Sequence, residues 1–451
     1  MTIRLSSLLR DDQISTEEAD LLCYGFDASQ MKGKPLSVLW PESVDDIVRI
    51  LRFSYEEDLP VIARGAGTAT TGSSVPQEGA LVISLERMKN IVEINPCDQY
   101  VVVEAGVING QLQRELSARG FFYPPDPSSM NFCTIGGNIA TNAGGPRAIK
   151  YGVTRRYVME IEAVLPEGRL IRTGTKTIKS VVGYDLKDLL IGSEGTLAII
   201  ARATLAIKPE PETIITILAS FSDLEASGNA VYRIISSGII PRCLEFMDRL
   251  AVEAVESYSP TGLGKAESLL IIELDGDVKS VQRDSERVVS IVHSLKGDVK
   301  VAEDSISREQ VWKARRAIPP ALFSIANTKI NEDIAVPRSH LTEMLVFLRG
   351  LSESSGIPIV SFGHAGDGNI HVNIMVNRED EERYGRAKEL VKRIFEETLR
   401  LGGTLSGEHG IGVTKSEFIN MEIGHNEMDL MRGIKRLFDY KGLLNPGKIF
   451  P

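Results

Sequence analysis

The sequence predicts an α+β protein built from two domains, and three observations support this. A strand, helix and strand pattern occupies the first part of the chain, and short β-branched runs follow it from Ala80 onward. The charged, proline-containing stretch Lys208–Glu212 has the composition of a linker. Beyond it, strands and helices restart in an order that favours an antiparallel sheet. We therefore expect domains at residues 1–209 and 210–405, with a closing segment at 406–451.

The first domain combines helical and strand periodicities. Ser43 to Asp46 resembles a capping box, and apolar residues recur at helical spacing from Val44 to Leu51. The runs ALVISL, IVEI and YVVVEAG predict strands, and a helix is expected from Asn109 to Ala118, ending at Gly120. EIEAVLPEG, RLIRTG and TLAIIARATLAI predict three more strands.

The second domain starts with the strand TIITILASF and a helix from Asp223 to Ser237. CLEFM, LLIIELDG, IPIVSFGH and NIHVNIMV have the apolar and β-branched character of strands. A long helix is expected from Asp380 to Leu401. This mixture predicts an α+β domain around an antiparallel sheet.

Composition excludes several classes of protein. Apolar residues make up 43% and charged residues 25%, as in soluble globular proteins. The net charge of -10 has the wrong sign for a protein that binds nucleic acid. The first residues lack a signal-peptide pattern, and no stretch approaches the ~18 apolar residues of a membrane span. The four cysteines form no CxxC pair, so we expect reduced thiols in a cytoplasmic protein.

Two glycine-rich segments indicate backbone that approaches a ligand. RGAGTATTG, residues 64–72, follows an expected strand and could form a nest of N–H groups for phosphate oxygens. Its G-x-G-x-x-x-x-G spacing, followed by Ser73, Pro76 and Gly79, does not fit a dinucleotide-binding turn that opens a helix. The irregular segment Pro124–Gly145 is long enough to be functional, and GSEGTL at 192–197 precedes a strand.

Three histidines fall in two further glycine-rich segments, GHAGDGNIHVN (363–373) and SGEHGIG (406–412). The first reads as a hairpin, in which His371 and Asn373 share one face and His364 can lie opposite His371. Two imidazoles that converge in this way, joined by one carboxylate, suit Zn, Fe or Mn. Glu408 and His409 are neighbours and point to opposite sides of an extended chain, so one can bind the metal while the other faces another group.

The order of these motifs resembles the FAD-linked D-2-hydroxy-acid dehydrogenases. The resemblance covers residues 36–450 and implies a two-part FAD-binding domain of the vanillyl-alcohol oxidase type, an α+β substrate (cap) domain and a C-terminal segment that returns to the flavin. It implies non-covalent FAD, because neither glycine-rich loop contains His and Cys133 is expected to be unattached. The implied FAD-binding residues are Arg64, Gly65, Ala66, Gly67, Thr68, Thr71, Gly72, Pro125, Asp126, Ser128, Thr134, Gly136, Gly137, Asn138, Thr141, Asn142, Gly145, Glu194, Gly195, Ile199 and Asn445.

The same resemblance assigns roles around the histidines. It implies a divalent metal, Zn, Fe or Mn, bound by His364, His371 and Glu408, with His409 as the catalytic base. Arg315, Lys329 and Asn373 match substrate contacts, and the two cations would hold a carboxylate. Pro319 stands where 2-hydroxyglutarate-specific members carry a hydroxyl, which weakens the case for that substrate.

These features predict oxidation of a D-2-hydroxy acid of the lactate or glycolate class by hydride transfer to flavin, with metal-assisted proton abstraction. The chain lacks a nicotinamide fingerprint and iron–sulfur cysteines, so the acceptor is expected to be external: a quinone, an electron-transfer flavoprotein, a cytochrome or an iron–sulfur subunit. A homodimer and peripheral association with the inner face of a membrane are both compatible with the sequence. The particular hydroxy acid, metal and acceptor stay open.

Three rival functions also stay open. An alkyl-dihydroxyacetonephosphate synthase-like flavoenzyme would be expected to have extra Lys and Arg near the histidine pair, whereas GHAGDGN is acidic. A flavin electron-transfer subunit without its own substrate would not be reduced by D-lactate. A metalloenzyme without flavin would be colourless.

Overall fold

The computed structural model describes residues 8–260, 266–302 and 304–450. The chain forms two compact units. The first comprises residues 1–144, 152–210 and 408–451, and the second comprises residues 145–151 and 211–407. The closing segment expected at residues 406–451 thus belongs to the first unit from residue 408 onward, whereas residues 406–407 and the short stretch 145–151 belong to the second unit.

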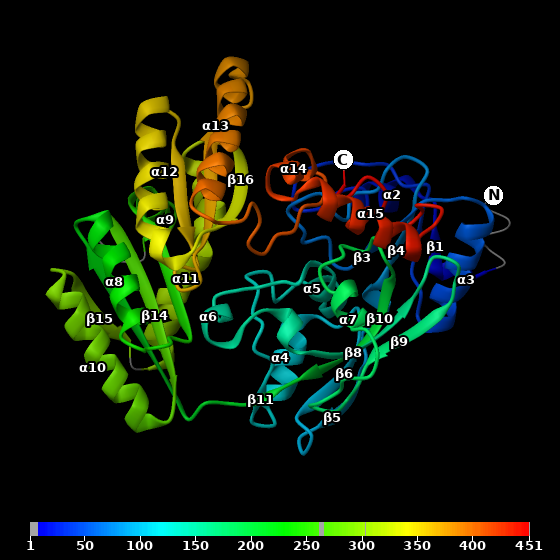
Figure 1. Cartoon of the computed structure of the whole chain (residues 1–451), viewed down its shortest axis with the longest axis horizontal. Coiled ribbons are helices and arrows are strands. Elements are labelled where there is room, and N and C mark those ends of the chain that lie inside the picture. Colours follow the sequence, from blue (N-terminus) through cyan, green and yellow to red (C-terminus); the bar gives the residue numbers. More distant parts are fainter. Residues whose placement is uncertain (1–7, 261–265, 303, 451) are drawn as a thin grey trace. The chain divides into compact units, whose positions relative to one another are not determined.

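The first unit contains two larger sheets (Figure 1). One has the order β1-β2-β4-β3, in which β4 pairs in parallel with both β2 and β3. The other, β5-β6-β10-β8-β9, is antiparallel throughout. The strands, including the small pair β7 and β11, are β1 (Ile14–Ser15), β2 (Ser37–Leu39), β3 (Val61–Arg64), β4 (Leu81–Ser84), β5 (Ile91–Asn95), β6 (Tyr100–Glu104), β7 (Phe121–Phe122), β8 (Val158–Val164), β9 (Leu170–Gly174), β10 (Ile199–Ala206) and β11 (Lys208–Pro209).

One helix, α3 (Val44–Glu56), joins the two larger sheets into a single core. Its residues Ile47, Ile50 and Leu51 are buried in one cluster with Ile83 of β4 and Ile199 of β10. The predicted capping box is confirmed, since Ser43 Oγ accepts the Asp46 N–H at 3.2 Å and Asp46 Oδ2 accepts the Ser43 N–H at 3.1 Å. The other helices of the unit are α2 (Glu18–Cys23), α4 (Asn109–Ser117), α5 (Ile135–Thr141), α7 (Leu186–Leu190), α14 (Ile419–Glu422) and α15 (His425–Phe438), with 3₁₀ turns η1 (Asp11–Gln13), η2 (Leu85–Arg87), η3 (Thr154–Arg156) and η6 (Ser416–Phe418).

The second unit is built on one seven-stranded antiparallel sheet, as the sequence predicts. Its order is β15-β12-β14-β13-β17-β18-β16. The strands are β12 (Thr213–Phe221), β13 (Cys243–Asp248), β14 (Ser268–Gly276), β15 (Asp298–Ala302), β16 (Thr328–Ala335), β17 (Ile359–Gly363) and β18 (Asn369–Val376).

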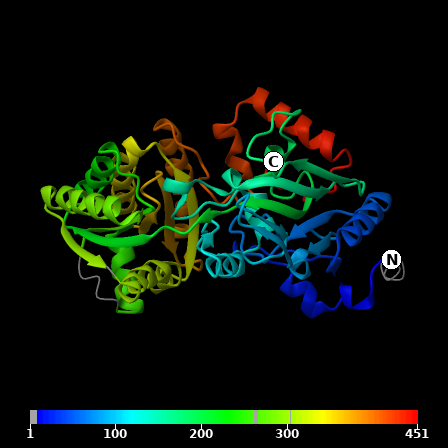
Figure 2. The same cartoon turned by 90° about the horizontal axis from the view of Figure 1, so that it is seen from below.

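Helices cover both faces of this sheet, which can be followed from below in Figure 2. α9 and α11 pack together with Leu269 and Ile271 of β14 in one buried cluster. A continuous layer against the strands is formed by α8, α10, α12 and α13. Because side chains alternate along a strand, Leu270 and Ile272 of β14 face away from the first cluster. The helices are α6 (Ala148–Tyr151), α8 (Leu224–Ser236), α9 (Arg249–Tyr258), α10 (Val278–Ser294), α11 (Ser305–Ala321), α12 (Leu341–Ser355) and α13 (Glu381–Arg400), with η4 (Leu322–Ser324) and η5 (Arg338–His340).

The short stretch 145–151 is fixed to the second unit by its C-terminal residues. Lys150 Nζ donates to the carbonyl oxygen of Asp275 at 2.6 Å and also contacts its carboxylate. The Tyr151 hydroxyl donates to Asp275 Oδ2 at 2.7 Å. Ile149 packs against Gly366, where a Cβ would lie 2.2 Å from the Ile149 side chain. The glycine-rich segment that continues from the first unit is therefore anchored in the second.

No helix among residues 8–260, 266–302 and 304–450 combines the length and apolar character needed to cross a membrane.

Candidate functional site

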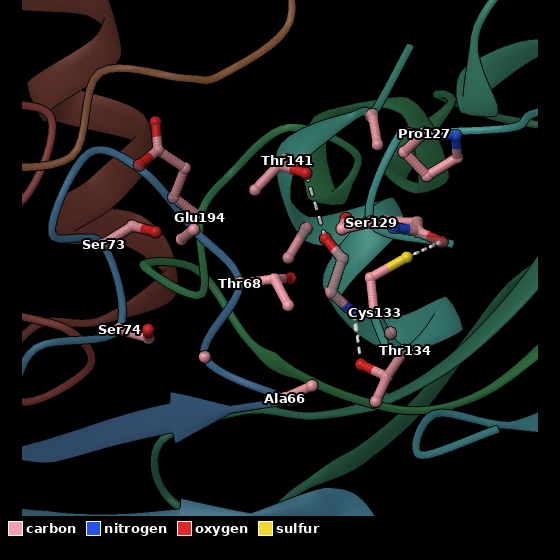
Figure 3. A pocket seen from close by; sticks show the side chains of 18 of the residues that line it. Ala66, Thr68, Ser73, Ser74, Pro127, Ser129, Cys133, Thr134, Thr141 and Glu194 are labelled. Atoms are coloured by element: carbon pink, nitrogen blue, oxygen red, sulfur yellow. Dashed lines mark hydrogen bonds between the residues drawn. The ribbon is translucent and has the colours of Figure 1, made fainter. Parts of the chain in front are cut away.

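A cavity in the first unit lies between the two predicted glycine-rich loops (Figure 3). In the figure, Ser73, Ser74 and Glu194 lie on one side of it, and Cys133 and Thr134 lie on the other. The predicted FAD-binding residues that line it are Arg64, Gly65, Ala66, Gly67, Thr68, Ser128, Thr134, Gly136, Gly137, Asn138, Thr141, Glu194 and Gly195. Further lining residues that the sequence did not single out include Ser73, Ser74, Ser129 and Gly144.

The first loop has the properties of an anion-binding nest. The backbone N–H groups of residues 66–71 form no hydrogen bond with any residue that the structure describes. Gly67 has φ +67° and its backbone packs against the Arg64 guanidinium, because a Cβ there would lie 2.2 Å from a guanidinium nitrogen. The buried Arg64 also donates to the Phe26 carbonyl oxygen at 2.7 Å. Free amides above a buried cation suit the oxygens of a pyrophosphate.

The second loop closes against the first. Thr134 caps α5 by accepting the Gly137 N–H at 3.2 Å, and the Thr141 hydroxyl donates to the Gly137 carbonyl oxygen at 3.1 Å. A Cβ on Gly65 would lie only 2.3 Å from Thr134 Oγ1, so the two loops can approach this closely only because residue 65 is glycine. Burial raises the pKa of the Cys133 thiol, which makes it a weak nucleophile.

Glu194 connects three parts of the first unit. Its carboxylate accepts the N–H groups of Ile411 and Gly412, each at 2.8 Å, which holds the segment that follows His409. Its carbonyl oxygen accepts from Asn445 Nδ2 at 2.5 Å, and the same amide donates to Ser73 at 2.9 Å. Burial raises the pKa of Glu194 to about 7, although the two N–H donors oppose this shift. The C-terminal segment therefore returns to the cavity wall.

The remaining predicted FAD residues lie outside the cavity lining: Thr71, Gly72, Pro125, Asp126, Asn142, Gly145, Ile199 and Asn445. Two of them still carry a sign of ligand binding. Thr71 Oγ1 and Asn445 Oδ1 are buried and have no hydrogen-bond partner among the residues that are described. Buried polar atoms without partners are rare and suit an additional ligand.

The second unit places three of the other predicted site residues on one face of its sheet: Lys329, His371 and Asn373. β16 and β18 pair in register, so that Lys329, Asn331 and Asp333 lie opposite Met375, Asn373 and His371. Because side chains two residues apart share a face, Lys329, Asn373 and His371 lie on the same face. β17 places Phe362 opposite His371 and leads into His364.

The predicted convergence of the two histidines is confirmed. The rings of His364 and His371 are 5.1 Å apart and nearly perpendicular. Two carboxylates that the sequence analysis missed stand beside them: Glu245 Oε1 lies 2.5 Å from His364 Nδ1, and Asp333 Oδ1 lies 3.4 Å from His371 Nδ1. Glu245 has a sequence signal, an acid within the otherwise apolar run CLEFM, whereas Asp333 follows Asn331 and Glu332 in a mixed strand and has no such signal.

The predicted substrate contacts differ in their electrostatic surroundings. Arg315 is buried and paired with Glu245, since its Nε donates to Glu245 Oε2 at 2.9 Å and its Nη2 lies 2.8 Å from the same oxygen in an ion pair. The ammonium group of Lys329 makes no hydrogen bond or ion pair with any residue that the structure describes, and burial lowers its pKa. Asn373 is fully buried, and its Oδ1 lacks a partner in the described part of the chain. Lys329 and Asn373 thus retain unsatisfied capacity for a polar ligand.

Glu408 and His409 line the cavity of the first unit. Glu408 approaches the second loop closely, because a Cβ on Gly144 would lie 2.6 Å from Glu408 Oε2. The preceding residue, Gly407, belongs to the second unit and donates its N–H to the Asp333 carbonyl oxygen at 3.1 Å. The boundary between the two units thus falls at the peptide bond between residues 407 and 408.

Two family models match the chain: "FAD binding domain" over residues 35–174 and "FAD linked oxidases, C-terminal domain" over residues 210–449. The chain is 39% identical to the glycolate oxidase subunit GlcD of Bacillus subtilis, over 97% of its own length and 94% of that protein. It is 33% identical to D-lactate dehydrogenase of Anaerostipes hadrus, over 93% and 90%. A D-lactate dehydrogenase of Archaeoglobus fulgidus is 36% identical, over 91% and 90%.

Solved structures share the fold at low identity. p-Cresol methylhydroxylase with bound substrate has a TM-score of 0.83 at 16% identity, covering 99% of this chain and 95% of that chain. Alkyldihydroxyacetonephosphate synthase has a TM-score of 0.77 at 19% identity, covering 99% and 84%. The predicted α+β architecture with an FAD-binding domain of the vanillyl-alcohol oxidase type is therefore confirmed, and the free amides, paired glycine loops and buried cation of the cavity fit FAD. The chain belongs to the family of FAD-linked oxidases.

Proposed function

We propose that this enzyme oxidises a D-2-hydroxy acid of the lactate or glycolate class to the 2-oxo acid, with FAD as the hydride acceptor. Relatives over nearly the whole chain are named glycolate oxidase subunit and D-lactate dehydrogenase. The observation that carries the proposal is the shared sheet face of Lys329, Asn373 and His371, which offers a cation, an amide and an imidazole to one small acid. The first unit would be the FAD-binding domain, and the second would be the substrate domain.

Lys329 is the principal candidate for binding the substrate carboxylate. It is largely removed from solvent and has no counter-charge among the residues that the structure describes, so an anionic group would restore its electrostatic balance. Asn373 would accept a hydrogen bond from the substrate with its unpartnered Oδ1, since its Nδ2 already donates to the carbonyl oxygens of Val360 and His371. Arg315 would add positive charge, reduced by its pairing with Glu245.

We propose that His364, His371 and Glu408 bind a divalent ion, because two imidazoles and one carboxylate are residue types that suit such an ion. Such an ion would lower the pKa of the substrate hydroxyl. We assign His409 the role of general base, which accepts the hydroxyl proton at an imidazole nitrogen. When bound, FAD would accept the hydride that leaves the substrate carbon. Residues 66–71 and Thr134 would hold and orient this cofactor.

The cofactor is proposed to be non-covalent. Cys133 lines the cavity, but burial raises the pKa of its thiol. No basic side chain in the described part of the chain activates this thiol. Acid precipitation of the purified protein should therefore leave the yellow flavin in the supernatant. A flavin that stays in the protein pellet would refute this part of the proposal.

Electrons would leave the reduced flavin for an external acceptor. Two relatives are named as subunits, so we propose a partner protein or small carrier as the acceptor: a quinone, an electron-transfer flavoprotein, a cytochrome or an iron–sulfur subunit. Association with a membrane surface and a homodimer stay predictions of the sequence analysis.

Anaerobic reduction of the bound flavin tests the proposed reaction. D-Lactate or glycolate should bleach the oxidised flavin spectrum, whereas a primary alcohol without a carboxylate should not. L-Lactate serves as the matched control for stereochemistry. Failure of every 2-hydroxy acid with fully loaded FAD would favour a flavoenzyme of the alkyl-dihydroxyacetonephosphate synthase type or an electron-transfer subunit.

A further inference from the structure

Glu245 is a completely buried carboxylate in the central region of the second unit's sheet. It lies on β13, where it pairs with Ile271 of the neighbouring strand β14. Burial of an isolated carboxylate is costly, so such a group persists only where it is paired and hydrogen-bonded. Glu245 therefore requires a specific structural or functional explanation.

Its two oxygens serve different partners. Oε2 accepts a hydrogen bond from Arg315 Nε at 2.9 Å and forms an ion pair with Arg315 Nη2 at 2.8 Å. Oε1 lies 2.5 Å from His364 Nδ1. Because Oε2 is paired with the permanently charged Arg315 guanidinium, Glu245 is an ionised carboxylate and can only accept hydrogen bonds.

This polarity fixes the hydrogen on His364. Because Glu245 Oε1 cannot donate, Nδ1 of His364 must carry the proton. In a neutral imidazole, Nε2 then carries the lone pair, and this lone pair is what a histidine uses to bind a metal ion. The ring is also restrained by its perpendicular contact with His371.

We infer that Glu245 is a positioning residue that holds His364 in the Nδ1–H form, so that Nε2 carries the lone pair that a divalent ion would bind. The inference rests on the metal site of the proposed function. It also assigns Arg315 a role, because a guanidinium has only donors and therefore holds Oε2 as an acceptor. Arg315 in turn packs over the Phe362 ring at 4.8 Å, which fixes its orientation.

Glu245→Gln gives a sharp test. Arg315 would keep the amide oxygen on its own side, so the new NH₂ group would face His364 Nδ1. Nδ1 would then have to accept, and the ring would shift to the Nε2–H form. Nitrogen-15 NMR of imidazole-labelled, metal-free protein, with His364 assigned from His364→Gln, should show Nδ1–H in the wild type and Nε2–H in the variant.

Zn²⁺ binding supplies an independent readout. Loss of a carboxylate that orients a histidine ligand typically weakens metal binding by about 10- to 100-fold, and we expect Glu245→Gln to fall in this range in competition with a chelating dye. Glu273→Gln is the matched control. Glu273 is also a buried carboxylate, on the adjacent strand β14, but it accepts from Thr216 at 2.9 Å and Trp312 at 2.6 Å. Its variant should keep wild-type Zn²⁺ affinity.

An Nε2–H form of His364 in the wild type would overturn the inference, and this measurement needs no folded variant of Glu245. Wild-type Zn²⁺ affinity in Glu245→Gln would overturn it too. Absence of Zn²⁺ binding in the wild type would refute the metal part of the proposed function. The tautomers of the metal-free protein would then support or refute the role of Glu245 by themselves.

Discussion

Gly65→Ala should weaken FAD binding, because residue 65 sets the separation of the two cofactor loops. A Cβ there would lie 2.3 Å from Thr134 Oγ1 and 3.5 Å from Thr134 Cβ. Ordinary contacts between heavy atoms lie near 3.5 Å, so one loop must move by about 1 Å. Thr134 yields poorly, since its side chain is β-branched and caps α5 through the Gly137 N–H.

The clash can be relieved in two alternative ways, and each has a cost. Overpacking of a well-packed site costs about 1 to 3 kcal/mol, whereas rotation of the Thr134 hydroxyl away from its cap costs about 1 kcal/mol. In the free protein the loops can separate and relieve this strain, whereas bound FAD requires both cavity walls in place. The strain then appears in the binding free energy, and 1 to 3 kcal/mol corresponds to about 5- to 150-fold weaker binding.

Titration of the apoprotein with FAD, followed by quenching of flavin fluorescence, measures this effect. Gly433→Ala in α15 is the matched control, because its Cβ would meet no atom within 4 Å and FAD affinity should not change. In a Thr134→Ala background the clashing oxygen is absent, so addition of Gly65→Ala should change the affinity by less than about twofold. Wild-type affinity in Gly65→Ala, or an equal loss in both backgrounds, would refute the reasoning.

Three further predictions concern single charged or titrating groups. His409→Asn should keep its metal while turnover falls by about 10²- to 10⁴-fold, whereas Glu408→Ala should lose both metal and activity. If metal analysis shows the reverse, the two roles are exchanged. Lys329→Met should lower kcat/KM for a 2-hydroxy acid by at least about tenfold, with FAD affinity unchanged. Burial raises the pKa of Glu194 to about 7 from an ordinary 4.5, so the folded apoprotein binds this proton more tightly than the unfolded chain. The unfolding free energy of the apoprotein should therefore fall by up to about 3 kcal/mol as the pH rises from 4.5 to 7. Urea unfolding of Glu194→Gln should lack this decrease.

Local patterns in the sequence predicted much of the architecture because their causes are local. The α3 capping box depends only on Ser43 and Asp46, and the predicted helix from Asn109 to Ala118 is observed at Asn109–Ser117. The hairpin around GHAGDGN follows from strand alternation and a glycine turn, which is sufficient to bring His364 and His371 together. Glycine clustering likewise indicated the two cofactor loops.

Pairings between distant segments could not be predicted in this way. Glu245 meets His364 across 119 residues of sequence and Arg315 across 70, and nothing in CLEFM specifies either partner. The placement of residues 145–151 in the second unit depends on Lys150 and Tyr151 reaching Asp275, which only the assembled sheet brings within reach. Such contacts are fixed by strand order rather than by local residue pattern.

Arg315 and Lys329 show why residue type alone does not identify an anion site. From residue type alone, both are cations that can bind a carboxylate, and the planar fork of Arg would make it the better ligand. The structure separates them, because Glu245 already neutralises Arg315, whereas no described carboxylate faces Lys329. A cation attracts a substrate through the charge that its surroundings leave uncompensated. We therefore expect Lys329 to have the larger electrostatic part in the proposed substrate binding, and Arg315 to act mainly through the carboxylate that it shares with His364.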